Sequence, residues 1–175
     1  MPLVGTRAAC NYTGKMTGLM PSLPTRHVFV YGTLRRGEQR DINLLTPAPR
    51  WIGPASVEGV LYDLGEYPGL VLGRAPGPGQ TKVKGDVYEI AGDLEPLLDE
   101  IEGVSPQPNG EYARRQVVVH LRPLEPPLAR NESTLASPLT CLVYEVTPGR
   151  AAGCPVIECG DWVGFRLARE GRERQ

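Results

Sequence analysis

Histidine and cysteine are scarce in this sequence, and its net charge is close to zero. Two histidines and four cysteines occur in 175 residues, and the formal net charge is −1. No two cysteines form a Cys-x-x-Cys pair, and the histidines stand apart from them, whereas a zinc site needs about four converging ligands. We therefore expect free thiols and no metal. The lack of clustered Lys and Arg also argues against nucleic acid as a partner.

Long apolar runs and nucleotide-binding loops are missing as well. No stretch of about 18 apolar residues occurs, so we predict no membrane-spanning helix and no membrane partner. Neither a Gly-rich phosphate loop nor a Gly-x-Ser-x-Gly elbow is present, so we expect no cofactor and see no clear serine nucleophile. A Cys–His nucleophile pair stays open, without a local signature. Residues 1–26 lack the apolar core of a signal peptide, and we expect a poorly ordered extension and a cytoplasmic location.

The remaining pattern is that of one domain, residues 27–170, built mainly from short strands. The 21 glycines and 18 prolines favour strands joined by turns. Apolar and β-branched runs predict strands at residues 27–31, 55–64, 70–72, 82–90, 116–121 and 139–146. Residues 73–80 and 122–138 are interpreted as loops, and residues 171–175 as a frayed tail. One clear helix within such a run of strands suggests an α+β fold whose sheet closes towards a barrel.

The clear helix is predicted at residues 93–103. Asp93 is a good N-cap residue, and Leu94, Leu97, Leu98 and Ile101 follow the i, i+3, i+4, i+7 spacing of one buried face. Gly103 provides a left-handed stop. Shorter helical segments are expected at residues 39–45 and 162–170, the second capped by Asp161.

The first candidate for chemistry is Tyr31-Gly32-Thr33-Leu34, where the first strand ends. Gly32 allows a sharp turn, so that successive N–H groups can converge on one spot and bind a carboxylate or oxyanion. Thr33 adds a hydroxyl donor. Such a string is also common in ordinary strand-to-turn transitions, so the pattern alone leaves both interpretations open.

The second candidate is Glu102, which flanks the apolar face of the predicted helix. Helical spacing places Asp99 towards solvent and leaves Glu102 as the acidic residue best placed to be half-buried. Burial and the helix C-terminus both raise the pKa of a carboxylate, so Glu102 could take and give a proton near neutral pH. An ordinary solvated glutamate before a helix stop is the alternative.

These two signals belong to a longer pattern that resembles the γ-glutamyl cyclotransferase-like, or AIG2-like, family. The order and spacing of the matching stretches agree with the family over about residues 27–167. These stretches are residues 28–38, 59–64, 67–70, 83–88, 98–103 and 112–115. The pairing of Tyr-Gly-Thr-Leu with Leu-Asp-x-x-Glu-Gly further along the chain is the most specific part.

The resemblance implies a fold, a site and a reaction. The fold is a small six- or seven-stranded, partly closed β-barrel with flanking helices. Tyr31, Gly32, Thr33 and Leu34 would hold the α-carboxylate of a γ-glutamyl substrate through backbone N–H groups, with Tyr112 as a further pocket residue. Glu102 would be the acid/base that helps convert a γ-glutamyl amine or amino acid to 5-oxoproline, without metal or cofactor.

Two other functions fit the same pattern. The pocket could release a γ-glutamyl group from a biosynthetic intermediate, or the chain could be a non-catalytic module that binds a small carboxylate or a protein. Fold alone does not decide between them. Neither the oligomeric state nor the leaving group follows from the sequence.

Overall fold

The computed structural model describes residues 25–73, 82–104, 110–122 and 138–173. Of the predicted N-terminal extension, all but Thr25 and Arg26 lies outside this part of the chain. Most of the two predicted loops at residues 73–80 and 122–138 lies outside it too.

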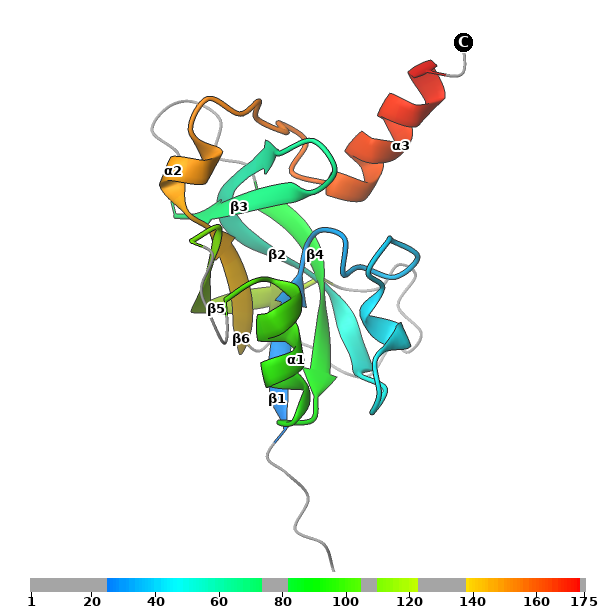
Figure 1. The fold of residues 1–175 in the computed structure, drawn as a ribbon. Helices are drawn as coiled ribbons and strands as arrows, with labels where there is room; N and C mark the ends of the chain where they lie inside the picture. The colour runs from blue at the N-terminus through cyan, green and yellow to red at the C-terminus, as the bar shows by residue number, and fades with distance from the viewer. Residues whose placement is uncertain (1–24, 74–81, 105–109, 123–137, 174–175) are drawn as a thin grey trace, which may run out of the picture.

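A small barrel forms the body of the molecule (Figure 1). The strands are β1 (Arg26–Val30), β2 (Arg50–Asp63), β3 (Pro68–Leu72), β4 (Lys82–Ile90), β5 (Tyr112–Leu121) and β6 (Leu139–Val146). They lie in the order β3-β2-β4-β1-β6-β5, and β5 also pairs with β2. Because β5 pairs with β2, the five strands β2, β4, β1, β6 and β5 form a closed barrel, and β3 extends the sheet beyond β2. This arrangement confirms the α+β class and the partly closed barrel with flanking helices.

Alternation along the strands creates two hydrophobic clusters. Phe29 and Tyr31 belong to the cluster that draws side chains from every barrel strand and so fills the interior. Val28 and Val30 belong to the other cluster, which includes Leu94 and Leu98 of helix α1 (Leu94–Ile101). Helix α1 therefore packs on the outside of the barrel, next to β1 (Figure 1). The turn that follows β1 lies near the C-terminal end of this helix, because residues of both line one cavity.

Several predicted boundaries differ from the structure. Strand β2 begins at Arg50, before the predicted residue 55. Its pairing with β4 shifts in register between Trp51 and Gly53. The Gly and Pro residues of this region obscure the strand pattern in the sequence. Strand β5 begins at Tyr112 because pairing with β6 extends it through the charged Arg114 and Arg115. In α1, Leu97 is 37 % exposed and was wrongly assigned to the core.

The ends of helix α1 follow the prediction in part. Asp93 occupies the N-cap position, but its side chain makes no capping hydrogen bond. Gly103 has a φ of 66°, so the predicted left-handed stop is confirmed. A short 3-10 helix, η1 (Ile42–Leu44), takes up part of the predicted helical segment at residues 39–45.

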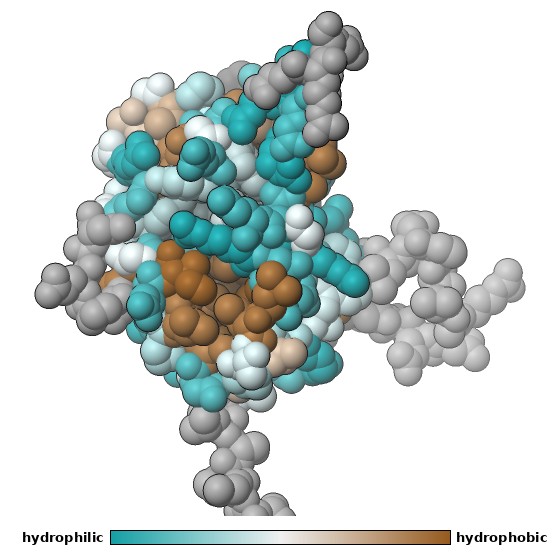
Figure 2. All heavy atoms as spheres, turned by 45° about the vertical axis from the view of Figure 1, so that its right-hand side comes forward, coloured by the Kyte–Doolittle hydropathy of each residue, from teal (hydrophilic) through white to brown (hydrophobic). Residues whose placement is uncertain are grey.

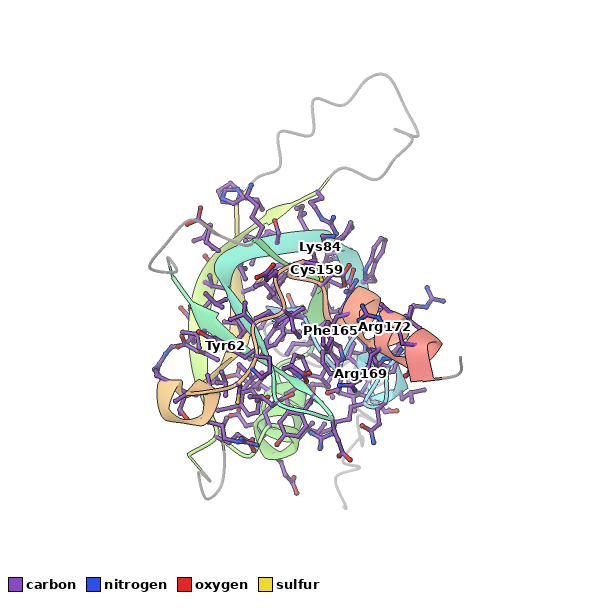
Figure 3. The ribbon with its side chains drawn as sticks, turned by 90° about the horizontal axis from the view of Figure 1, so that it is seen from above. Tyr62, Lys84, Cys159, Phe165, Arg169 and Arg172 are labelled. Carbon is purple, nitrogen blue, oxygen red and sulfur yellow. The ribbon has the colours of Figure 1, made fainter. Side chains whose placement is uncertain are left out.

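The C-terminal part crosses one end of the barrel before it leaves the body. The short helix α2 (Pro148–Ala151) was not predicted. The segment around Cys159 then passes over the barrel, and α3 (Trp162–Glu173) projects to the side (Figure 3). Asp161 precedes α3 and accepts a 3.4 Å hydrogen bond from the Gly164 N–H, as expected of a cap. Helix α3 continues past the predicted end at residue 170.

The surface is mixed in character. One face carries a compact hydrophobic patch framed by hydrophilic side chains (Figure 2). Within the described ranges, no helix combines the length and apolar character that crossing a membrane requires.

Candidate active site

A cavity of about 270 Å³ lies between the end of β1 and the C-terminal end of α1. The four residues from Tyr31 to Leu34, here called the 31–34 turn, form one wall, and Glu102 forms another. Tyr112 lines the cavity as well, so the structure brings together all six residues that the sequence singled out. The remaining lining residues are Phe29, Val30, Arg40, Tyr67, Pro68, Glu100, Ile101, Gly103, Glu111 and Tyr144.

In the 31–34 turn, backbone carbonyls take part in hydrogen bonds within the described part of the protein, whereas most backbone N–H groups do not. The carbonyls of Gly32, Thr33 and Leu34 accept hydrogen bonds from the N–H groups of Arg35, Arg40 and Ile42. Among the described residues, no hydrogen bond uses the N–H of Gly32, Thr33 or Leu34 as its donor. Donors left unused beside a cavity suit an anion such as a carboxylate.

Gly32 is required by the close approach of β3. A Cβ atom at Gly32 would lie 2.7 Å from Cγ and 3.0 Å from Cδ of Pro68. Real Cβ contacts are not this short, so a side chain here would push the turn and β3 apart.

Both candidate tyrosines have their hydroxyls engaged with main chain. The Tyr31 hydroxyl donates to the carbonyl of Tyr144 at 2.7 Å and accepts from the Leu70 N–H at 3.3 Å. The Tyr112 hydroxyl donates to the carbonyl of Pro68 at 2.9 Å. Burial raises the pKa of both hydroxyls well above the ordinary tyrosine value. Both hydroxyl protons are thus engaged in hydrogen bonds within the protein, and the two side chains line and support the cavity.

Glu102 terminates α1 and faces the cavity. Burial raises the pKa of Glu102 to about 7, with the nearby Arg40 lowering it and Glu111 raising it. Within the described part of the chain, no hydrogen bond or ion pair involves the Glu102 carboxylate. A carboxylate with such a pKa exists in both protonation states near neutral pH.

Asp99 does not point to solvent, and this prediction was wrong. It is 7 % exposed, accepts a hydrogen bond of 2.8 Å from the Tyr144 hydroxyl and forms an ion pair of 2.8 Å with Arg114. The helix therefore buries a wider face than its leucines indicate, because β5 and β6 supply polar partners for the carboxylate.

Three cavity residues were missed by the sequence analysis or left out of its candidate site. Arg40 reaches the end of α1, where its Nη1 donates to the carbonyl of Ile101 at 3.1 Å. Tyr67 donates to Glu111 at 2.7 Å, and Arg150 pairs with the same Glu111 oxygen at 3.0 Å. Tyr67 falls within a stretch that matches the family pattern, but no local motif marks Arg40 or Glu111.

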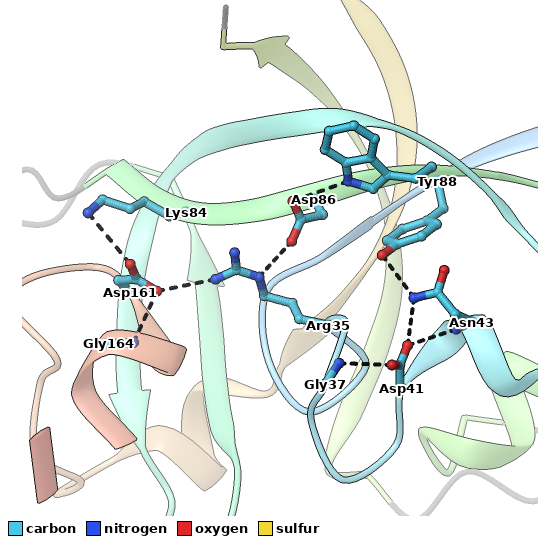
Figure 4. A network of polar contacts seen from close by, with 10 residues as sticks. Arg35, Gly37, Asp41, Asn43, Lys84, Asp86, Tyr88, Asp161 and Gly164 are labelled. Carbon is cyan, nitrogen blue, oxygen red and sulfur yellow. Dashed lines mark hydrogen bonds and ion pairs between the residues drawn. The ribbon is translucent and has the colours of Figure 1, made fainter. Parts of the chain in front are cut away.

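Ion pairs fix the segment that follows the 31–34 turn. Arg35 donates to Asp86 of β4 at 2.7 Å and to Asp161 at 3.2 Å (Figure 4). Further along, Glu38 accepts two hydrogen bonds from Arg166 of α3, at 2.9 and 2.7 Å. The wall of the cavity is thus tied to both the barrel and the last helix.

The chemistry available to this site follows from these groups. Unused N–H donors can hold an anion, and a carboxylate with a pKa near neutrality can move a proton. Across the described ranges, no group of three or more His, Cys, Asp or Glu side chains is placed to hold a metal ion.

Comparison with known proteins gives a consistent result. The model of the family described as "Gamma-glutamyl cyclotransferase, AIG2-like" matches residues 28–164. A Halalkalibacterium halodurans protein named as a candidate gamma-glutamylcyclotransferase is 31 % identical over 118 residues, covering 67 % of this chain and 89 % of that protein. A Vibrio cholerae protein with the same kind of name is 40 % identical over 77 residues, covering 44 % of this chain and 62 % of that protein.

Solved structures share the fold. An AIG2-like protein from Mus musculus is 26 % identical, with a TM-score of 0.56 over 77 % of this chain and 86 % of that one. YkqA from Bacillus subtilis is 23 % identical with a TM-score of 0.58. The match covers 85 % of this chain but 43 % of YkqA, so it spans less than half of that protein.

Proposed function

The chain belongs to the AIG2-like gamma-glutamyl cyclotransferase family, and we propose that it converts a γ-glutamyl amine or γ-glutamyl amino acid to 5-oxoproline and a free amine. The observation that carries the proposal is the position of Glu102. Its carboxylate, with a pKa of about 7, shares one small cavity with the unused N–H donors of the 31–34 turn.

The first step in the proposed mechanism is to fold the substrate. A γ-glutamyl amide carries its own nucleophile, the α-amine, whose attack on the γ-carbonyl carbon closes a five-membered ring. The N–H groups of Gly32, Thr33 and Leu34 would hold the α-carboxylate, which anchors the amine within reach of the γ-carbonyl. Positioning of this kind accounts for a large share of the rate of intramolecular reactions.

Glu102 would then move the proton. At neutral pH most of the α-amine is protonated, so Glu102 first accepts a proton and frees the nitrogen lone pair. The nitrogen attacks the γ-carbonyl, a new C–N bond closes the ring, and the bond to the leaving amine breaks. Glu102 returns its proton to that leaving nitrogen, and the freed carboxylate then takes the second proton that the positively charged ring nitrogen must lose. This proton also passes to the departing amine, which leaves as an ammonium ion, so the carboxylate ends in its starting state.

A substrate panel tests this proposal. We would incubate the protein with γ-glutamyl-alanine, γ-glutamyl-ε-lysine, glutathione and a γ-glutamyl polyamine, and follow 5-oxoproline by mass spectrometry. The matched variants are Glu102→Gln and Glu158→Gln, the second being an exposed glutamate in the segment before α3.

Each outcome has a distinct meaning. Product that is lost in Glu102→Gln and retained in Glu158→Gln supports both the reaction and the acid/base. Product that survives in Glu102→Gln keeps the reaction and removes Glu102 from its role. If the folded protein gives no product with any substrate, the cyclotransferase proposal fails in favour of a binding module or release of a γ-glutamyl group from a larger molecule.

A further inference from the structure

Arg40 connects the two walls of the cavity. Its main-chain N–H donates to the carbonyl of Thr33 at 2.9 Å, in the middle of the 31–34 turn. Its guanidinium donates to the carbonyl of Ile101 at 3.1 Å, at the residue that precedes Glu102. A single residue, through its main chain on one side and its side chain on the other, therefore joins the turn to the end of α1.

The end of α1 is a favourable place for a cation. The last carbonyls of a helix have no partner within the helix and carry partial negative charge. The acidic side chains Glu100 and Glu102 lie at this same end of α1, and both line the cavity. Arg40 thus meets a region where negative charge accumulates.

Arg40 is also the only cation among the described residues that line the cavity. Glu111, the other acidic residue that lines it, is already balanced by Arg150 and by the Tyr67 hydroxyl. The remaining titratable groups around Glu102 are tyrosines from the 31–34 turn, β5, β6 and the turn before β3, namely Tyr31, Tyr112, Tyr144 and Tyr67.

Building on the proposed function, we propose that Arg40 is a positioning residue for Glu102. It ties the end of α1 to the 31–34 turn and supplies the positive charge that favours the ionised carboxylate, the form that accepts a proton from the substrate amine. The direction of the pKa shift agrees, because Arg40 lowers the pKa of Glu102 against the larger effect of burial.

The charge-neutral variant Arg40→Gln tests this role. Without the cation, the pKa of Glu102 should rise by roughly half a unit, the size expected for one partly solvated charge. The acidic limb of kcat/KM against pH should move to higher pH by the same amount, with activity converging on the parent value at pH 9. Arg40→Lys keeps the positive charge, so its acidic limb should lie close to that of the parent protein.

Arg36→Gln is the matched control. Arg36 lies in the same loop and is exposed, but it does not line the cavity. It removes the same charge from the same segment, so it reports the general effect of net charge. A shift in Arg40→Gln no larger than in Arg36→Gln would overturn the proposal. So would a rise in KM with an unmoved pH profile, since that result would make Arg40 a substrate-binding residue.

A measurement without substrate separates this inference from the proposed function. The Glu102 carboxyl can be titrated by NMR in protein labelled with ¹³C-glutamate, with Glu102→Gln identifying its signal. If the parent protein makes no 5-oxoproline, the cyclotransferase proposal fails. The titrations of Arg40→Gln, Arg40→Lys and Arg36→Gln still decide whether Arg40 sets the protonation of Glu102.

Discussion

The hydroxyl of Tyr144 donates a 2.8 Å hydrogen bond to the buried carboxylate of Asp99, and so joins β6 to the helix that ends at Glu102. The main-chain carbonyl of Tyr144 also accepts a hydrogen bond from the Tyr31 hydroxyl. One residue of β6 therefore contacts both the helix that ends at Glu102 and the first residue of the 31–34 turn.

Removal of the Tyr144 hydroxyl should weaken the fold. In Tyr144→Phe the buried Asp99 keeps Arg114 but loses a hydrogen bond to a charged group, which contributes roughly 1.5–3 kcal/mol. We expect the free energy of unfolding in urea to fall by about that amount, and turnover to fall because the end of α1 is less firmly held. Tyr62→Phe is the control, since its hydroxyl bonds to no other described residue. Equal loss in both variants would contradict the assigned role.

The pH dependence of stability should reveal Glu102 without any substrate. Its pKa rises from 4.5 to about 7 on folding, so the folded protein holds this proton more tightly than the unfolded chain. The contribution of this group to stability is therefore full below about pH 4.5 and is lost as pH rises through about 7. Since one pKa unit corresponds to about 1.4 kcal/mol, the loss at pH 8 amounts to at most roughly 3 kcal/mol.

The variant Glu102→Gln should then be more stable than the parent at pH 8 and equally stable at pH 4. Denaturant unfolding at the two pH values measures this difference, with Glu158→Gln as the exposed control. A Glu102→Gln protein that gains nothing at pH 8 would show that the carboxylate is better solvated than the cavity suggests, and would weaken the proposal that it is the acid/base.

The parts of the fold that follow local rules could be predicted from the sequence. Alternation of apolar residues identified β4 and β6 with their observed bounds, and the spacing of Leu94, Leu98 and Ile101 identified α1. Gly103 ended the helix as predicted because the requirement for a positive φ is local. The 31–34 turn and Glu102 were recognised as a pair because their motifs belong to a known family pattern.

The parts that depend on distant partners could not be predicted in this way. Asp99 is buried because Tyr144 and Arg114 meet it from other strands, and helical spacing contains no information about them. Arg40 reaches the cavity because its loop folds back on Thr33. Arg114 and Arg115, near the start of β5, are charged, and their pairing with β6, not their own pattern, makes them part of a strand.

Gly32→Ala should damage the turn itself. The added methyl group would lie 2.7 Å from Pro68 Cγ, so the turn and β3 must separate, at a cost of roughly 1–3 kcal/mol. We expect a lower free energy of unfolding and a large loss of kcat/KM, because the N–H donors move with the turn. Gly149→Ala is the matched control, since a Cβ there meets nothing within 4 Å. A fully active Gly32→Ala would argue against anion binding by this backbone.

The ion pair between Glu38 and Arg166 should connect α3 to the cavity wall. The Glu38 side chain is 4 % exposed and accepts two hydrogen bonds from Arg166. Arg166→Gln would leave a buried carboxylate without its main partner, which costs more than the pair itself contributes. We expect a loss of roughly 3–5 kcal/mol in the free energy of unfolding, and a higher KM because Glu38 lies in the segment that continues from the 31–34 turn.

The double variant Glu38→Gln/Arg166→Gln separates these two effects. It removes the buried charge together with its partner, so most of the stability lost in Arg166→Gln should return. The rise in KM should remain, because the bidentate link from the loop to α3 is still absent. Arg172→Gln, an exposed change on the same helix, controls for the charge of α3. If KM returned to the parent value in the double variant, α3 would serve the fold alone and would not position the substrate wall.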